Sequence, residues 1–366
     1  MLETLPLSGA DWRIGVTVNS GIQADESPTL MPTLGEYPIY DATLYEVMAN
    51  DDERNWRFRE ALERFAKDKV VIDIGTGAAL VWALEAARIG ASQVYAIEAM
   101  KSSAQAASEL LETMDCADRI SLIHAESTSL SLEQRAEVCV AEIIGSLAGA
   151  EGAAAVLSDA KKRLLKPNAV IIPHQCLTFA AAANFAKVLA VTTPAFPTMA
   201  LPYLKHIFTW AGGPFDVRLR VANPSANGIL SDHGVVERLD FNGDLRLNQV
   251  QEVGLKMESA GSVDGILTWL SMSCLPDQAP LDALQCDCNW ASIYFPLFDE
   301  AIAVKAGDTL RLRFETVLGE DGIHPDYRIH ATLETAAGRH ESNHSSAYKH
   351  TQLRTHPVYR GLFPAI

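Results

Sequence analysis

Short apolar runs alternate with segments of helical periodicity along the first half of the chain. Residues 51–66 carry apolar positions at helical spacing and lead into the β-branched run 70–74, while the alanine-rich residues 78–90 predict a second helix. The other elements expected in this half are strands at 94–97, 120–124, 138–143 and 170–172, and a helix at 153–165. Strands that alternate with helices predict an α/β, doubly wound parallel sheet that ends near Pro173.

The pattern changes after Pro173, where helical periodicity fades and short alternating runs appear. These runs lie at 216–221, 265–270, 291–297 and 309–315. We therefore expect an antiparallel β-barrel or sandwich in the second half. Residues 184–215 are rich in proline, glycine and aromatic residues and fit an inserted arm better than a barrel hairpin. The expected division is an N-terminal segment (1–50), a parallel-sheet domain (51–173) and a β-barrel domain (174–366).

Charge and composition narrow the possible partners. The formal net charge of −16 would repel the phosphates of a nucleic acid and attract a cationic ligand. The chain begins without the basic and apolar regions of a signal peptide, and no apolar run is long enough to cross a bilayer. We therefore expect a cytoplasmic protein with a basic substrate, without nucleic-acid or membrane partners. The six cysteines form neither a paired framework nor a zinc-binding spacing.

A glycine turn follows the first predicted strand. The sequence Asp73-Ile74-Gly75-Thr76-Gly77 opens the next helix, where glycines let backbone N–H groups approach a ligand closely. Leu80 replaces the third glycine of a dinucleotide fingerprint. A simple tight turn between strand and helix therefore explains this segment as well as a nucleotide-binding loop does. Glu98 ends the second predicted strand, where a carboxylate can accept both hydroxyls of a ribose, although it could also be a capping or solvated residue.

Two glutamates flank a loop after the strand that begins at residue 138. Glu142 and Glu151 are nine residues apart, and Gly145 and Gly149 lie between them. Considered without further context, loop glutamates of this kind are more often simply solvated.

Three segments in order resemble the opening segments of the protein arginine methyltransferase family. They are IYDATLYEVMANDDERNWRFREAL (39–62), VVIDIGTGAAL (70–80) and VYAIEAM (94–100), and the likeness extends over roughly residues 40–315. It is closest to the monomethylating, type III branch. The separation of Glu142 and Glu151 matches the family's double-glutamate loop. The resemblance implies an S-adenosylmethionine-dependent methyltransferase acting on the arginine guanidino group, with a Rossmann-like domain followed by a β-barrel.

The resemblance also implies roles for individual residues. Met48, in a helix covering the cofactor, would pack near the sulfonium, and Arg54 would pair with the methionine carboxylate. Without the resemblance, Arg54 reads as a surface helix arginine paired with a neighbour such as Asp51. The remaining cofactor contacts implied are Asp73, Gly75, Thr76 and Gly77 in the methionine and ribose loop, Glu98 on the ribose, and Glu126 and Ser127 near the adenine.

The implied catalytic pair is Glu142 and Glu151. Two carboxylates that grip a guanidinium draw its positive charge toward the nitrogens they touch, which leaves the remaining terminal nitrogen a better nucleophile. Substrate contacts are implied for Tyr40, Asn289 and Trp290. Asn289 stands where the family has a histidine, so a proton-acceptor role there is in doubt. Trp290 could equally be a core aromatic residue.

Partners and product follow from the same resemblance. It implies a homodimer formed through the arm, and a singly methylated guanidine as the product. The acceptor remains open between a protein or peptide arginine and free L-arginine, since negative charge suits both. A catalytically silent, methyltransferase-like binding module is a further alternative.

Residues 340–344 spell the HExxH zinc-peptidase pattern, which suggests a different class of enzyme. That motif needs a helix to bring both histidines to one face, whereas Ser342 and Asn343 are poor helix formers and the flanks resemble strands joined by a polar turn. We therefore expect a hairpin tip or a chance match, and no metal.

Overall fold

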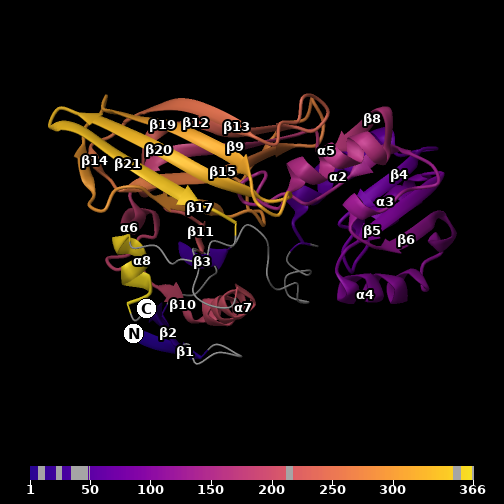
Figure 1. The fold of residues 1–366 in the computed structure, drawn as a ribbon, viewed down its shortest axis with the longest axis horizontal. Helices are drawn as coiled ribbons and strands as arrows, with labels where there is room; N and C mark the ends of the chain where they lie inside the picture. Colours follow the sequence, from indigo (N-terminus) through magenta and orange to yellow (C-terminus); the bar gives the residue numbers. More distant parts are fainter. Residues whose placement is uncertain are drawn as a thin grey trace.

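The computed structural model describes residues 1–6, 13–21, 27–33, 48, 50–211, 217–348 and 356–364. Figure 1 shows a parallel sheet with helices at one end of the molecule and large antiparallel sheets at the other. A smaller layer that contains both chain termini lies beside the antiparallel sheets.

The parallel sheet has the strand order β6-β5-β4-β7-β8, as expected of a doubly wound α/β fold. Its strands are β4 (Val70–Ile74), β5 (Gln93–Glu98), β6 (Ile120–His124), β7 (Ala136–Val140) and β8 (Leu165–Ile172), and its helices are α2 (Asp52–Phe65), α3 (Val81–Ile89), α4 (Lys101–Leu111) and α5 (Ala153–Arg163). The predicted parallel sheet is confirmed. β4 is buried along its whole length, in keeping with a central strand covered on both faces.

Two element boundaries differ from the prediction in ways that shape the site. Helix α3 begins at Val81 instead of residue 78, because Leu80 adopts a left-handed conformation (φ 51°) that no helix can continue. Strand β7 ends at Val140 instead of 143, so Glu142 lies in a loop beyond the sheet.

The second half is built from antiparallel sheets, as expected. A seven-stranded sheet has the order β12-β9-β15-β17-β11-β3 with β16 on β15, a second sheet has the order β13-β19-β20-β21, and β14 pairs with β18. The strands are β3 (Thr29–Thr33), β9 (Gln175–Ala183), β11 (Arg218–Ala222), β12 (Ile229–Asp240), β13 (Gln249–Lys256), β14 (Gly261–Val263), β15 (Gly265–Ser273), β16 (Leu281–Asp282), β17 (Ser292–Pro296), β18 (Ile302–Val304), β19 (Thr309–Leu318), β20 (Pro325–Thr335) and β21 (Gly338–Ser346). Buried residues alternate along β19, which places one face of that sheet on an apolar core.

The described part of the predicted arm is largely helical. It contains α6 (Phe185–Val188), β10 (Phe196–Pro197), the 3₁₀ turn Thr198–Ala200 and α7 (Leu201–Ala211). These elements share a buried apolar cluster with β1 (Leu2–Pro6), β2 (Arg13–Asn19) and α8 (Pro357–Leu362). Figure 1 shows this layer beneath the antiparallel sheets.

The HExxH segment is part of a β-strand, so the zinc-peptidase reading is wrong. Residues 340–344 lie within β21 and pair with β20, and the hairpin tip falls before them at residues 336–337. On a strand, two histidines four residues apart are separated by about 13 Å. His344 is buried, with Nδ1 2.8 Å from the carbonyl oxygen of Pro296.

Among the residues that the structure describes, no helix is both long and apolar enough to span a membrane. The same residues contain no group of three or more His, Cys, Asp or Glu side chains arranged to hold a metal ion.

Candidate active site

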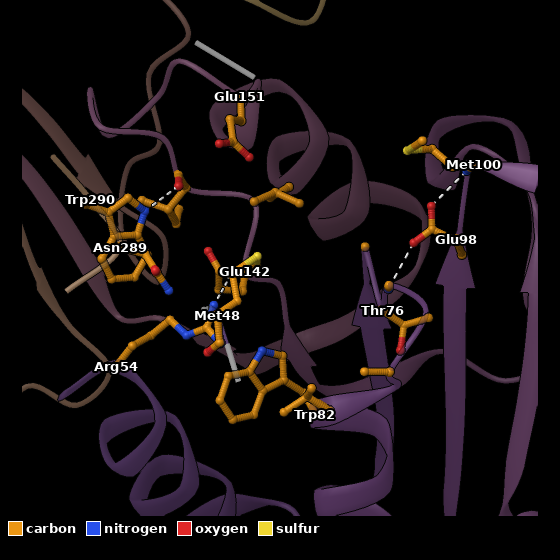
Figure 2. A pocket seen from close by; sticks show the side chains of 16 residues that line it. Met48, Arg54, Thr76, Trp82, Glu98, Met100, Glu142, Glu151, Asn289 and Trp290 are labelled. Atoms are coloured by element: carbon orange, nitrogen blue, oxygen red, sulfur yellow. Dashed lines mark hydrogen bonds and ion pairs between the residues drawn. The ribbon is translucent and has the colours of Figure 1, made fainter. Parts of the chain in front are cut away.

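One cavity of about 310 Å³ joins the parallel sheet to the antiparallel half (Figure 2). Its lining on the cofactor side comprises Met48, Arg54, Gly75, Thr76, Gly77, Ala79, Val81, Trp82, Glu98 and Met100. On the other side lie Glu142, Ile143, Ile144, Glu151, Asn289 and Trp290. The cavity sits at the carboxyl ends of β4 and β5, which is where open α/β sheets bind ligands.

The glycine loop after β4 turns sharply at the cavity wall. Gly75 and Gly77 adopt positive φ angles of 78° and 66°, which favour glycine over other residues. A Cβ atom on Gly75 would lie 3.0 Å from Cγ2 of Ile143, so this position also permits close approach of the loop after β7. The predicted tight turn therefore faces the cavity with its backbone exposed to a ligand.

Asp73 lies beneath this loop instead of on the cavity wall. It is fully buried, and its Oδ2 accepts hydrogen bonds from Thr76 Oγ1 (2.6 Å) and from the backbone N–H of Ala83 (3.0 Å). Burial raises the pKa of Asp73 to about 7. The structure therefore makes Asp73 a residue that positions the loop, and a direct contact with the cofactor stays a prediction.

Glu98 lies at the end of β5, on the cavity. Its two carboxylate oxygens accept hydrogen bonds from the backbone N–H groups of Met100 (2.7 Å) and Gly77 (2.9 Å), which fix the carboxylate in place. Each oxygen keeps a second lone pair with which to accept a hydrogen bond from a ligand hydroxyl. The local capping role and the predicted ribose-binding role are thus compatible.

The two residues implied for adenine contact do not line this cavity. Glu126 and Ser127 lie at the 3₁₀ turn Ser127–Ser129, where the buried Ser127 accepts a hydrogen bond from Arg163 through its carbonyl oxygen (2.9 Å). Their role in adenine binding stays a prediction. Tyr40 lies outside the described residues.

Arg54 is a buried residue that connects both ends of the cavity. Its Nη1 lies 2.8 Å from Glu142 Oε2, and its Nη2 donates to the carbonyl oxygen of Met48 (2.6 Å). Asn55 Oδ1 accepts from the same guanidinium, and Trp82 lies 5.7 Å from Arg54 Cζ. The reading of Arg54 as a surface residue is wrong, because only 3% of the residue is exposed. Its pairing with a methionine carboxylate stays a prediction.

Glu142 combines burial with a cationic neighbour. Burial raises the pKa of its carboxyl group to about 7, while the charge of Arg54 opposes that rise. Glu151 is partly buried just before α5 and lines the same cavity. In Figure 2 the Glu151 side chain approaches the cavity from the opposite side to Arg54. Both glutamates predicted from the sequence therefore lie on one cavity.

The loop between these glutamates is held by a carboxylate that sequence reasoning missed. Glu237 on β12 is fully buried, and its Oε2 accepts from the N–H of Gly149 (3.2 Å) and from Thr178 Oγ1 (2.8 Å). Thr178 in turn accepts from the N–H of Ala148 (3.0 Å). Nothing in the local sequence around Glu237 distinguishes it from a solvated strand residue.

The loop before β17 joins the site through backbone hydrogen bonds. The N–H of Asn289 donates to Asp51 Oδ2 (2.9 Å), and Trp290 Nε1 donates to the carbonyl oxygen of Ile144 (2.7 Å). Asp51 also caps α2 by accepting from the N–H of Arg54 (2.9 Å). Trp290 is only 3% exposed and packs in the apolar core, as one of its two predicted roles requires. It also lines the cavity, and its contact with the substrate stays a prediction.

Several apolar residues on the cavity were also missed by sequence reasoning. Trp82 stacks on Phe58 at a centroid distance of 4.6 Å, and Met100 is 44% exposed at the cavity. Ile143 and Ile144 complete this apolar lining. The position of Trp82 shortly after the glycine loop in the sequence was the only signal that could have placed one of these residues on the cavity.

Comparison with known proteins agrees with this geometry. The family model for ribosomal protein L11 methyltransferase (PrmA) matches residues 59–173, which contain the parallel sheet. The chain is 26% identical to an arginine N(omega)-methyltransferase of Streptomyces achromogenes subsp. streptozoticus, over 85% of this chain and 91% of that protein. It is 27% identical to protein arginine N-methyltransferase 7 of Aedes aegypti over 72% of this chain, but spans only 41% of that relative.

Solved structures give the same fold. The PRMT1 enzyme–prozyme heterotetramer of Trypanosoma brucei, solved with AdoHcy, superimposes with a TM-score of 0.66 and 17% identity, covering 83% of this chain and 98% of that one. Protein arginine methyltransferase 10 of Arabidopsis thaliana superimposes with a TM-score of 0.65 and 17% identity, covering 84% of this chain and 97% of that one. The fold and the similarity along most of the chain lead to one conclusion: this chain is similar to arginine N-methyltransferases in sequence and shares the fold of the solved protein arginine methyltransferases.

Proposed function

We propose that this protein transfers a methyl group from S-adenosylmethionine to a terminal nitrogen of an arginine guanidino group. One observation carries the proposal: Glu142 and Glu151 line the same cavity as Glu98 and the glycine loop. A pair of carboxylates suits a guanidinium, and the glycine loop with Glu98 suits a nucleoside. The name of the Streptomyces relative, which specifies the ω nitrogen of arginine, supports this reaction.

The cavity fits the cofactor on chemical grounds. Glu98 presents a fixed carboxylate to a ribose, and the backbone of Gly75 and Gly77 leaves room for close approach. Met48 and Trp82 offer apolar surface. When bound, S-adenosylmethionine supplies a methyl group on a positively charged sulfur. Arg54 would hold the methionine carboxylate of S-adenosylmethionine once the Arg54 guanidinium turns away from Glu142.

Glu142 and Glu151 would orient and polarise the acceptor. An arginine guanidinium remains protonated in proteins and is a poor nucleophile. Two carboxylates on its other nitrogens localise its charge there and aim the free terminal nitrogen at the methyl carbon. That nitrogen gains the methyl group as the carbon–sulfur bond breaks, and it loses one proton to a carboxylate or to water. S-adenosylhomocysteine and a methylated guanidinium are the products.

The proposal extends to product and assembly. A single methyl transfer agrees with the resemblance of residues 39–100 to the monomethylating branch. A closed β-barrel over 174–366, next to a cofactor domain over 51–173, would form the acceptor side. A homodimer through the arm is supported by two exposed apolar residues on it, Met199 (52% exposed) and Trp210 (45%). The T. brucei relative is itself an oligomer.

A turnover assay tests the function. Purified protein is incubated with methyl-labelled S-adenosylmethionine and with L-arginine, an arginine-containing peptide or a lysate, and products are identified by mass spectrometry. We expect monomethylarginine in at least one reaction. If S-adenosylmethionine binds but no guanidine is methylated, the protein is the silent binding module. Dimethylated product would contradict single transfer.

A further inference from the structure

Strand β11 places two arginines on the face of the sheet that leads toward the glutamate pair. Arg218 and Arg220 are two residues apart and therefore share one face, whereas Leu219 and Val221 point into an apolar cluster on the other. Arg218 is only 3% exposed and Arg220 is half-buried. Buried cations are rare because taking a charge out of water is costly, so a buried arginine beside a half-buried one on one inner face calls for a reason.

These arginines share a second, small cavity with Glu151. The cavity, of about 10 Å³, is lined by Arg218, Arg220, Glu151, Thr33 and Ser146 among others. It has space for one water-sized group, which is also the size of a carboxylate oxygen. Since Glu151 lines both cavities, the small cavity adjoins the active site at this side chain.

The two arginines have different surroundings. Arg218 Nε donates to Ser346 Oγ (3.0 Å), and its guanidinium lies 4.9 Å from the Tyr327 ring. Its charge also opposes the rise in the pKa of Glu237 that burial causes. Arg220 reaches the active site itself, because its Nη2 donates to the carbonyl oxygen of Asn289, a residue on the main cavity. Arg220 is therefore the better placed of the two to meet a substrate.

The charge pattern across Glu151 favours one kind of acceptor. A carboxylate pair attracts a guanidinium, and an arginine pair beside it attracts an anion. Free arginine carries both charges, joined by its three-methylene stem and its α carbon. An internal arginine of a basic peptide has no α-carboxylate, and its cationic neighbours would be repelled by Arg218 and Arg220.

We propose that Arg220, assisted by the charge of Arg218, binds the α-carboxylate of the acceptor, which is a free guanidino amino acid such as L-arginine. This inference rests on the proposed methyltransferase function and specifies its substrate class. Arg220 is thus a specificity-determining residue, and the small cavity beside Glu151 receives one oxygen of that carboxylate.

The test compares L-arginine with agmatine, which has the same guanidine but no carboxylate, in the unchanged protein and in Arg220→Gln. We expect kcat/KM for L-arginine to exceed that for agmatine by about 100-fold in the unchanged protein. In Arg220→Gln this ratio should fall to less than about 10, through loss of the reaction with L-arginine. Arg220→Lys should restore part of it. Arg311→Gln, a change at an exposed arginine on β19, is the matched control.

The ratio separates recognition from structural damage. If Arg220→Gln lowers both reactions equally, Arg220 acts only by holding the Asn289 loop, and the inference fails. It also fails if the unchanged protein does not distinguish the two acceptors or prefers an arginine-containing peptide, although the methyltransferase function then stands. If no acceptor is methylated, the binding of L-arginine and of agmatine to S-adenosylhomocysteine-loaded protein is measured by calorimetry. Binding of L-arginine that Arg220→Gln abolishes supports the subsite. Equal affinity for L-arginine and agmatine, or no binding of L-arginine, overturns it.

Discussion

Arg54 Nη1 and Glu142 Oε2 lie 2.8 Å apart in a buried ion pair that connects helix α2 to the loop after β7. The two residues are 88 positions apart in the chain. One belongs to the cofactor end of the cavity and the other to the guanidinium end. Because a buried charge without a partner is costly, Arg54 favours the ionised form of Glu142 and opposes the rise in its pKa that burial causes.

Glu98 should control cofactor affinity. Glu98→Ala removes a carboxylate that is fixed by two backbone N–H groups and faces the cavity, so S-adenosylmethionine affinity should fall about 10-fold or more. Isothermal calorimetry measures the change. Glu112→Ala, at an exposed position after α4, is the control and should bind normally. Unchanged binding by the Glu98 variant would remove this residue from the cofactor site.

Glu142 and Glu151 should control turnover. Glu142→Gln and Glu151→Gln keep side-chain size but remove the charge that acts on the guanidinium, so kcat/KM should fall by about 100-fold or more. Cofactor affinity measured by calorimetry should be nearly unchanged. Glu133→Gln at an exposed site should retain full activity. Normal turnover in either active-site variant would rule out the two-carboxylate mechanism.

The reaction should depend on the ionisation of Glu142. The pKa of Glu142 is raised to about 7 by burial, and only the carboxylate form can hold a guanidinium. The profile of kcat/KM should therefore rise with pH below about 7 and level off above it, since kcat/KM reports the ionisation of the free enzyme. When the acceptor is saturating, the midpoint of the pH profile of kcat should lie at a lower pH than that of kcat/KM. The bound cation favours the carboxylate form of Glu142 and so lowers its pKa. A flat profile between about pH 5 and pH 8 would contradict this assignment.

Asp73 should make stability depend on pH. Its pKa is raised from 3.8 to about 7 in the folded protein, chiefly by burial. Between these two pKa values, Asp73 holds a proton in the folded state that it has lost in the unfolded state. The contribution of Asp73 to the free energy of unfolding is therefore present at low pH and is lost as the pH rises through about 7. Asp73→Asn should flatten the pH dependence of the free energy of unfolding, measured by urea denaturation. An equally steep dependence in this variant would show that other groups cause it.

The arm should mediate self-association. Met199→Asp and Trp210→Asp place charges on two exposed apolar side chains of the arm and should shift a dimer toward monomer in light scattering. Val250→Asp, at an exposed apolar position on β13, is the control and should leave the dimer intact. An unchanged protein that stays monomeric at high concentration would show that the arm packs only on its own chain.

The sequence by itself determined the elements that arise from local patterns. The apolar run 70–74, the glycine turn after it, Glu98 at a strand end and the alternating runs of the second half are all found where they were expected. Periodicity reports which face of an element is buried, and glycine reports a backbone that must bend, because both are properties of neighbouring residues. The pair Glu142 and Glu151 was found through family resemblance, not through any local signal.

Only the tertiary structure decided which distant groups meet. It buried Arg54 against Glu142, placed Glu237 against Gly149 in the loop between the two active-site glutamates, and brought Arg220 to the Asn289 loop. It also placed the HExxH residues in a strand, although the sequence motif alone suggested a metal site. Such contacts depend on how sheets and loops pack over many tens of residues, where burial changes both the partners and the pKa of a charged side chain. A local sequence pattern carries no information about that packing.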